Sequence, residues 1–215
     1  ECTRLGCGLR YLYFARLVGD TMVCATPELE KAAVRKLMTR HRNDLTPDEV
    51  VYCSKKIEEN LFSCEDFLSR DSVLYYLSFG KEVRTDAMIV RSLNLGKKVY
   101  VPRVVEAENK LEVCGINSLE TGFDINTFGI REPSGVPAVS LNKIDVIVTP
   151  GLAFNSSGGR IGFGGGYYDR LFMELPGNSL RLGIAYDFQI VGSLHQDVWD
   201  KKMQKVFTEK DTLNC

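Results

Sequence analysis

The 215-residue sequence has few histidines, no long apolar run and almost no net charge. No stretch approaches the roughly 18 consecutive apolar residues of a membrane-spanning helix. Lysine plus arginine number 27 and aspartate plus glutamate 28, so no overall field favours nucleic acid or an anionic membrane. Only His41 and His195 are present, and neither lies near a GxSxG motif. A hydrolase triad therefore has little support, and we expect both histidines to be structural or surface residues.

The sequence also lacks any CxxC pair. Its seven cysteines are odd in number and irregularly spaced, which argues against a disulfide framework or a zinc site and favours reduced thiols in a cytosol-like compartment. The hydrophobic content of 44% and the charged content of 26% are ordinary for a globular protein. The length fits one sizeable domain, or at most two small ones.

Residues 1–25 differ in composition from the rest, because arginines alternate with leucines and acidic residues are scarce. This pattern is compatible with a mitochondrial transit peptide, although serine is lacking. A processed product, a fragment and a reading frame extended upstream of Met22 are equally compatible. The interpretation we favour is a poorly ordered N-terminal extension, followed by one domain over residues 26–215. The expected location is cytoplasmic, or mitochondrial if the extension is a transit segment.

The most informative stretch is residues 150–172, in which six glycines occupy the nine positions 158–166. An apolar run over 144–148 precedes it and a segment with helical periodicity follows, which predicts the order strand, glycine loop, helix. Glycines let a ligand approach main-chain N–H groups, and a helix N-terminus adds a partial positive charge. The expected guest is an anion such as phosphate.

Other residues distinguish this stretch from a plain surface turn. Arg160 lies inside the loop, Tyr167 and Tyr168 lie at its exit, and Asp169 falls in the first turn of the predicted helix. The loop matches neither the P-loop pattern nor the dinucleotide-binding pattern, so those two functions are not indicated.

The rest of the chain alternates predicted helices and strands. Thr26 and Thr46, each followed by proline, start two helices, and a third is predicted from Thr85 to Leu95. Such alternation indicates a single three-layer α/β domain with a mostly parallel sheet and crossover helices. The predicted strands cover residues 72–78, 98–101, 111–116, 144–148 and 180–186.

The first predicted helix carries two cations on one face. Lys31 and Arg35 are four residues apart, so both can reach one site, although such pairs are commonly just solvated. The predicted inward stripe of this helix consists of Val34, Leu37, Met38 and His41. In parallel sheets ligands bind beyond the carboxyl ends of the strands, which is where Phe79, Glu82 and Arg103 are expected.

The string PGLAFNSSGGRIGFGGGYYDR, residues 150–170, resembles the signature of the 5-formyltetrahydrofolate cyclo-ligase family, also called methenyltetrahydrofolate synthetases. The pair Lys31 and Arg35 resembles the family's KxxxR element, residues 128–133 its GIxEP segment, and residues 200–209 its closing DxxMxxVxTE strand. The resemblance covers about residues 29–210. Asn155 is a departure, because the family usually has Asp there, and this change could lower the affinity for Mg²⁺. Trp199, where His is frequent, is a smaller departure.

The resemblance implies that the protein binds 5-formyltetrahydrofolate and ATP with Mg²⁺. We expect a monomer, and the balanced charge and the lack of a long apolar run predict no nucleic-acid or membrane partner. Arg160 and Tyr167 would be catalytic, and Asp169 and Asp200 would converge on the metal. ATP would be held by Lys31, Arg35, Arg160, Ile161, Gly162, Phe163, Gly164, Gly165, Gly166, Tyr167 and Tyr168. The folate would contact Phe79, Glu82, Arg103, Phe128, Glu132, Phe163, Gly164, Gly165, Gly166 and Tyr167.

The implied reaction closes an imidazoline ring to give 5,10-methenyltetrahydrofolate, with ATP going to ADP and phosphate. Phosphorylation of the formyl oxygen would create a leaving group, so no covalent nucleophile is needed, and positioning and electrostatics would carry the rate. Two alternatives remain. One is a folate- or nucleotide-binding protein without catalysis, and the other is a sugar-phosphate isomerase that uses the glycine loop without ATP.

Overall fold

The computed structural model describes residues 26–120, 122–126, 129–197 and 200–215. The predicted extension over residues 1–25 lies outside this part of the chain, as do Phe128 and Trp199. Within the described part, none of the helices is both long and apolar enough to cross a membrane.

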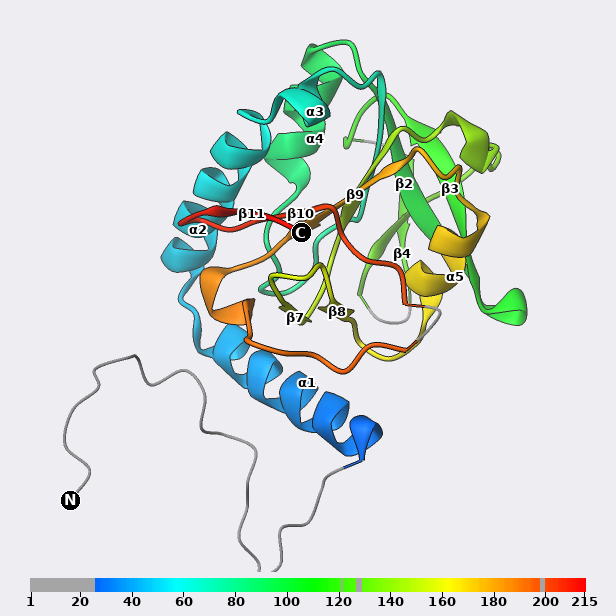
Figure 1. The fold of residues 1–215 in the computed structure, drawn as a ribbon. Helices are drawn as coiled ribbons and strands as arrows, with labels where there is room; N and C mark the ends of the chain where they lie inside the picture. Colours follow the sequence, from blue (N-terminus) through cyan, green and yellow to red (C-terminus); the bar gives the residue numbers. More distant parts are fainter. Residues whose placement is uncertain (1–25, 121, 127–128, 198–199) are drawn as a thin grey trace, which may run out of the picture.

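A seven-stranded sheet forms the centre of the molecule, with the strand order β11-β10-β9-β6-β1-β2-β3 (Figure 1). The five strands β10, β9, β6, β1 and β2 pair in parallel, while the edge strands β3 and β11 are antiparallel to their neighbours. The prediction of a mostly parallel sheet is therefore confirmed. The strand bounds are β1 Ser72–Tyr75, β2 Lys98–Val105, β3 Lys110–Ile116, β6 Val146–Thr149, β9 Leu180–Ile184, β10 Lys205–Phe207 and β11 Thr212–Asn214.

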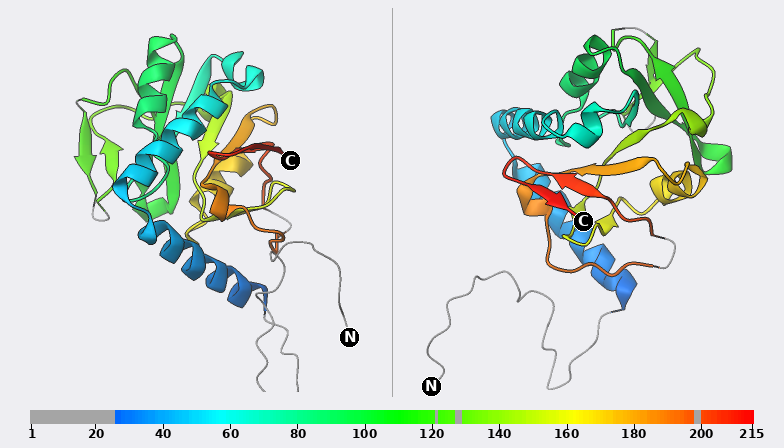
Figure 2. Two further views of the ribbon diagram at one scale, coloured as in Figure 1. Left: turned by 90° about the vertical axis from the view of Figure 1, so that its left-hand side faces the viewer. Right: turned by 45° about the horizontal axis from the view of Figure 1, so that its top comes forward.

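Helices cover both faces of this sheet, as the two views of Figure 2 show. Side chains alternate along each strand, so Val73 and Tyr75 of β1 pack into one core cluster with α2 and α4, whereas Leu74 packs into another with α5. The three-layer prediction is confirmed. The helices are α1 Pro27–Asp44, α2 Pro47–Leu61, α3 Glu65–Leu68, α4 Asp86–Asn94 and α5 Tyr167–Glu174, with 3₁₀ turns η1 Glu106–Glu108, η2 Leu141–Lys143 and η3 Asp187–Gln189.

The two largest differences between predicted and observed strand ends run in opposite directions, while β6 and β9 differ from the predicted bounds by one or two residues. β1 ends at Tyr75 rather than Ser78, because the chain turns there into the loop that carries Glu82. β2 continues through Pro102 to Val105 instead of ending at Val101. β1 pairs with β2 only as far as Tyr100, so a proline beyond that point interrupts no hydrogen bond to β1.

The first helix, α1, packs against two short hairpin strands, β7 (Ala153–Phe154) and β8 (Arg160–Ile161), rather than against the main sheet (Figure 1). Its buried side chains are Val34, Met38 and Arg42, while Leu37 and His41 are exposed. The predicted inward stripe was therefore wrong at Leu37 and His41. The prediction assigned mainly apolar residues to the inward face, whereas the buried residue at position 42 is an arginine that is paired with a carboxylate. His41 and His195 are both surface residues, as predicted.

Lys97 is a buried cation with a structural role. The residue is 9% exposed, and its ammonium donates to the carbonyls of Phe67, Leu68 and Arg70 at the end of α3. Burial lowers the pKa of Lys97, and the neighbouring Asp71 opposes this effect. The lysine therefore satisfies carbonyls that α3 leaves unpaired.

Replacing Lys97 with methionine should destabilise the fold, because the hydrocarbon stem is kept but the carbonyls lose their donor. An unsatisfied buried polar group costs about 1–3 kcal/mol, and we expect a loss of about 2 kcal/mol in the free energy of unfolding measured by urea denaturation. The exposed neighbour Lys98 provides the control. Equal stability of Lys97→Met and Lys98→Met would show that the three contacts contribute nothing.

The strand order creates a switch point beside β1. From β1 the chain first adds β2 on one side, and it later returns to place β6 on the other side. The connections that leave the carboxyl ends of β1 and β6 therefore diverge, and such crevices are where parallel α/β sheets bind ligands. The loop after β1 carries Phe79 and Glu82, and the loop after β6 begins the glycine-rich stretch.

Candidate active site

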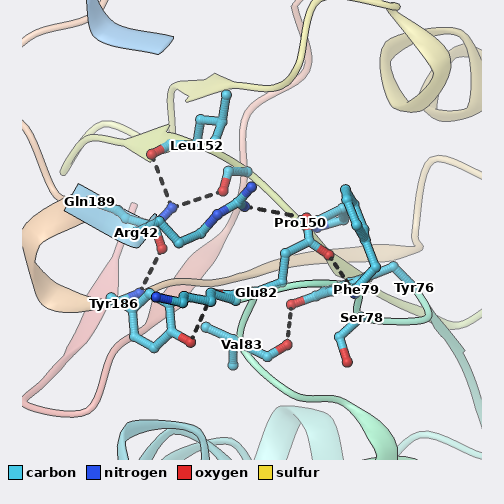
Figure 3. Close-up of polar contacts among 12 residues, drawn as sticks. Arg42, Tyr76, Ser78, Phe79, Glu82, Val83, Pro150, Leu152, Tyr186 and Gln189 are labelled. Atoms are coloured by element: carbon cyan, nitrogen blue, oxygen red, sulfur yellow. Dashed lines mark hydrogen bonds and ion pairs between the residues drawn. The ribbon is translucent and has the colours of Figure 1, made fainter. Parts of the chain in front are cut away.

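Loops from three strands meet at this switch point (Figure 3). They follow β1, β6 and β9, and α1 adds Arg42 from outside the sheet. Together they enclose a small cavity of about 10 Å³, which is room for about one water molecule. Its lining residues are Arg42, Tyr76, Glu82, Val83, Pro150, Gly151, Ile184 and Gln189.

Glu82 is the buried carboxylate of this site, with 6% of its side chain exposed. One carboxylate oxygen accepts from the main-chain N–H of Phe79 at 3.3 Å, and the other lies 3.4 Å from Nη1 of Arg42. Burial raises the pKa of Glu82 to about 7, although Arg42 and the Phe79 amide act in the opposite direction. Its charge therefore changes near neutral pH.

Gln189 fixes the start of the glycine-rich stretch from the β9 side (Figure 3). Its amide nitrogen donates to the carbonyls of Gly151 at 2.9 Å and Leu152 at 3.0 Å, and its amide oxygen accepts from the Tyr186 N–H at 2.9 Å. The Tyr186 hydroxyl donates to the carbonyl of Lys81, one residue before Glu82, at 3.2 Å. These bonds set the relative positions of the β1 and β6 loops.

The glycine-rich stretch is not one loop. Its first part folds into the hairpin β7–β8, so the predicted order of strand, loop and helix was too simple. Gly158 in this hairpin has φ of +81°, and a Cβ there would lie 2.4 Å from the carbonyl oxygen of Met203. The glycine lets the hairpin pack against the chain before β10. Only residues 162–166 form an open loop that leads into α5.

Asn155 shapes the turn of this hairpin. Its side-chain oxygen accepts from the main-chain N–H groups of Ser157 at 3.2 Å and Gly159 at 2.7 Å, and from the Ser157 hydroxyl at 3.0 Å. The residue is 5% exposed. Its oxygen therefore works within the turn, where a carboxylate would accept the same three bonds.

Replacing Asn155 with aspartate should leave the fold and the Mg²⁺ requirement within about twofold of wild type, because a carboxylate keeps the three bonds. Alanine at the same position should lower the free energy of unfolding by about 2–3 kcal/mol, since it leaves buried N–H groups unpaired. Urea denaturation measures the second effect and a Mg²⁺ titration of activity the first. A markedly lower Mg²⁺ requirement in Asn155→Asp would instead place position 155 at the metal.

The open loop is held from two helices. Nε of Arg35 on α1 donates to the carbonyl of Gly162 at 2.9 Å, and Nη2 of Arg170 on α5 donates to the carbonyl of Gly165 at 2.7 Å. Gly164 and Gly166 have φ of +107° and +67°, a backbone conformation that residues other than glycine rarely adopt. These carbonyl contacts hold the loop open at the N-terminus of α5.

Arg160 is the buried cation at the base of the loop, with 6% of its side chain exposed. Its Nη2 donates to the Asp169 carboxylate at 2.8 Å, and its guanidinium lies 5.7 Å from the ring centre of Tyr168 and 5.6 Å from that of Phe172. Its Nε is buried and has no hydrogen-bond partner in the described part of the chain. Arg160 thus retains donor capacity beyond its ion pair.

Lys31 lies between two carboxylates. Its ammonium is 2.6 Å from Asp197 and 3.6 Å from Asp200. Burial lowers the pKa of Lys31, but the hydrogen bond and charges of these carboxylates outweigh it and raise the pKa overall. The hydrogen bond from Lys31 lowers the pKa of Asp197. The two predicted metal ligands therefore each pair with a predicted phosphate-binding cation, Asp200 with Lys31 and Asp169 with Arg160.

No group of three or more histidine, cysteine, aspartate and glutamate side chains could hold a metal within the described residues. A fully protein-made cage is thus not present in that part. Asp169 and Asp200 come from separate segments, and each offers oxygen ligands only. This donor set fits Mg²⁺, which is commonly bound by one or two carboxylates together with substrate phosphates and water.

Some predicted residues serve mainly as structural anchors here. Arg103 donates to Glu112 at 2.8 Å and to the Val136 carbonyl at 3.0 Å. Glu132 of the β4–β5 hairpin, whose strands are Phe123–Ile125 and Arg131–Pro133, accepts from the N–H of Val104 at 3.2 Å. Ile161 is buried against α1. The folate-binding role of the first two stays a prediction.

The aromatic residues assemble at the mouth of the site. The ring centres of Phe79 and Phe163 are 6.1 Å apart, which brings the loop after β1 to the open glycine loop. Tyr167 begins α5, and its ring lies 5.1 Å from the Arg170 guanidinium. The Phe79–Phe163 contact joins the predicted folate wall to the predicted ATP loop, whereas the catalytic role of Tyr167 stays a prediction.

Sequence reasoning missed four residues of the site: Arg42, Arg170, Gln189 and Asp197. A signal for Arg42 was available, because it lies seven residues after Arg35 and therefore on the same helical face. Nothing in the local sequence marks Gln189 or Asp197, whose contacts depend on how distant loops meet.

The family model described as the 5-formyltetrahydrofolate cyclo-ligase family matches residues 27–209. A probable 5-formyltetrahydrofolate cyclo-ligase of Caenorhabditis elegans is 27% identical over 195 residues, covering 85% of this chain and 94% of the relative. The Haemophilus influenzae 5-formyltetrahydrofolate cyclo-ligase is 29% identical, with 80% and 93% covered.

Solved structures agree with this assignment. The NMR structure of Aquifex aeolicus 5,10-methenyltetrahydrofolate synthetase has a TM-score of 0.74 and 32% identity, covering 86% of this chain and 92% of that one. The Mycoplasma pneumoniae 5,10-methenyltetrahydrofolate synthetase, at 24% identity and a TM-score of 0.67, shares the fold. The match over nearly all of the described residues, together with the site at the β1–β6 switch point, shows that the chain belongs to the 5-formyltetrahydrofolate cyclo-ligase family.

Proposed function

We propose that the protein catalyses the ATP-dependent cyclisation of 5-formyltetrahydrofolate to 5,10-methenyltetrahydrofolate, with release of ADP and phosphate. The observation that carries this proposal is the meeting of two different half-sites at one switch point. A buried carboxylate with an aromatic wall, Glu82 and Phe79, contacts a glycine loop lined by cations through Phe163. The first half suits a flat polar ring and the second a polyphosphate.

The folate half would work by orientation. The Glu82 carboxylate, when ionised, accepts hydrogen bonds and so matches ring N–H donors of a reduced pterin. The rings of Phe79 and Phe163 offer apolar faces beside it. Together these groups would hold the formyl group toward the glycine loop, which is the geometry that an intramolecular ring closure needs.

The nucleotide half would work by charge. The main-chain N–H groups of the open loop, the N-terminus of α5 and the side chains of Lys31, Arg35 and Arg160 would bind the triphosphate. Asp169 and Asp200 would hold Mg²⁺ with the phosphates, and the ion would neutralise phosphate charge when bound. The protein groups would thus stabilise the charge that moves during phosphoryl transfer.

The proposed reaction has two steps. The formyl oxygen attacks the γ-phosphorus of ATP, and the bond to the β-phosphate oxygen breaks to release ADP. N10 of the folate then attacks the activated formyl carbon and loses its proton, while the carbon–oxygen bond breaks and phosphate leaves. The phosphorylation converts an oxygen that cannot depart into a good leaving group, so no enzyme nucleophile is needed.

Absorbance near the methenyl product band tests this function directly. Purified protein is mixed with 5-formyltetrahydrofolate and Mg²⁺, with and without ATP, and ADP is quantified in parallel. A rise that requires ATP, with one ADP formed per methenyl product, is the expected result. No rise while folate still binds by calorimetry would instead support a binding protein that lacks the chemistry. Tight binding of a sugar phosphate without any ATP binding would support the isomerase alternative.

A further inference from the structure

Arg42 contacts both halves of the proposed site at once. Its Nη1 lies 3.4 Å from Oε1 of Glu82, and its guanidinium carbon lies 5.1 Å from the ring centre of Phe163. Glu82 follows β1, whereas Phe163 belongs to the open glycine loop. The side chain that joins them comes from a third element, α1, which packs on the hairpin β7–β8.

The chemistry of arginine suits this double contact. A guanidinium is planar and always charged, so it can offer its N–H groups to a carboxylate and its face to an aromatic ring. A lysine ammonium has the charge but no plane. The Arg42 and Glu82 side chains are only 9% and 6% exposed. Buried ion pairs of this kind contribute little net stability over an apolar replacement, which directs attention to a role other than folding.

We infer that Arg42 is a positioning residue for the folate half of the site: it holds the Glu82 carboxylate and fixes it relative to Phe163 at the edge of the glycine loop. The inference rests on the proposed function. Arg42 itself need not touch the substrate, since it acts through the carboxylate and the ring that it holds.

The charges around Glu82 support this assignment. Arg42 faces the carboxylate as a cation from α1, while the phenols of Tyr76 and Tyr168 face it from the end of β1 and from α5. Burial, followed by the charge of Glu82, raises the pKa of both phenols, so they stay neutral near pH 7. Without Arg42 only the Phe79 amide would oppose the effect of burial, so the pKa of Glu82 should rise further and the carboxyl should stay protonated to higher pH.

The same residue links the two substrates. Phe163 packs against Phe79 at 6.1 Å, and Arg35, on the same face of α1 as Arg42, holds the carbonyl of Gly162. The aromatic wall and the glycine loop are therefore both attached to α1. Loss of the Arg42 contact releases Glu82 and Phe163 but leaves the Arg35 contact in place. Folate binding should therefore be impaired more than ATP binding.

The test compares Arg42→Met and Arg42→Lys with Arg40→Met, an exposed arginine on the same helix. We expect Arg42→Met to raise the folate KM at pH 7 about tenfold or more, with the ATP KM within about threefold. As the pH is lowered, the folate affinity of Arg42→Met should begin to fall at a pH at least about one unit higher than in wild type. The midpoint of the pH dependence of folate affinity should change little in Arg42→Lys. Arg40→Met should match wild type in its KM values and in this midpoint. A folate KM and a pH midpoint unchanged in Arg42→Met would overturn the inference.

Combination with Glu82→Gln separates positioning from folding. Because glutamine does not titrate, folate affinity in Glu82→Gln should have no pH midpoint near 7, and adding Arg42→Met should not restore one. Urea denaturation gives a readout that needs no activity. The Glu82 pKa is raised on folding, so stability is lost as pH rises from about 4.5 to about 7 in wild type, and this loss should extend to higher pH in Arg42→Met.

The two proposals fail in distinguishable ways. A wild-type protein without ATP-dependent methenyl formation would refute the proposed function, whereas the pH dependence of unfolding would still report on the Arg42–Glu82 pair. Equal changes in the folate KM and the ATP KM of Arg42→Met, with a lower melting temperature and no pH shift, would show that Arg42 is only structural.

Discussion

Arg160→Ala should lower turnover at saturating folate by about a hundred- to a thousandfold, the usual effect of removing one preorganised donor from a site of developing charge. Arg160 is buried, paired with Asp169 at 2.8 Å and supported by the rings of Tyr168 and Phe172. The ATP KM should rise strongly while the folate dissociation constant stays within about threefold. Steady-state kinetics and calorimetric titration measure the two quantities.

Arg91→Ala is a suitable control for this variant. Arg91 on α4 also pairs with a carboxylate, Glu58 at 3.3 Å, and also lies over a ring, Phe62 at 4.2 Å. It should therefore report the effect of removing an arginine with similar neighbours outside the site. Equal weakening of ATP and folate binding in Arg160→Ala would contradict its role at the phosphates.

Glu82→Gln should raise the folate KM about 10- to 100-fold, because hydrogen bonds to a charged group contribute about 1.5–3 kcal/mol. The ATP KM should stay near normal. In wild type, folate affinity should fall as pH drops through about 7, since burial raises the pKa of Glu82 to about 7 and the protonated carboxyl loses acceptor capacity. Glutamine should abolish this dependence. Fluorescence titration with folate between pH 6 and pH 9 measures both effects.

Glu58→Gln is the matched control, because it removes a carboxylate from an ion pair on the far helices α2 and α4. It should change neither the folate KM nor its pH dependence. An unchanged folate KM in Glu82→Gln would remove Glu82 from the site, whatever its charge.

The regular elements were predictable where a local signal was strong. Thr26 and Thr46 cap the two helices that they were predicted to start, and Thr46 also exchanges hydrogen bonds with Glu49 in a capping box. The alternation of helices and strands also predicted the mostly parallel sheet correctly. The hairpin β7–β8 was missed because its strands have two residues each, too few to show any periodicity. Its existence depends on packing against α1 and on the Asn155 turn.

The candidate site was only partly predictable for a different reason. Arg160 stands out within the glycine-rich stretch, Glu82 was placed beyond the carboxyl end of a predicted strand, and the resemblance assigned roles to both. Their partners are set by topology: Arg42 lies 40 positions from Glu82, and Lys31 lies 166 positions from Asp197. No local pattern encodes such pairs. They follow only once α1 is known to cross the end of the sheet.

The ion pairs of Lys31 have a consequence for ligand selection. With Asp197 at 2.6 Å and Asp200 at 3.6 Å, the ammonium is already ordered, so little side-chain entropy is lost when a ligand takes its place beside it. The two carboxylates also act as a built-in competitor, because an incoming anion must replace them. If Lys31 binds phosphate as proposed, an anion of low charge such as chloride or acetate should displace the carboxylates less readily than a triphosphate. Lys31 would then select ligands by their charge.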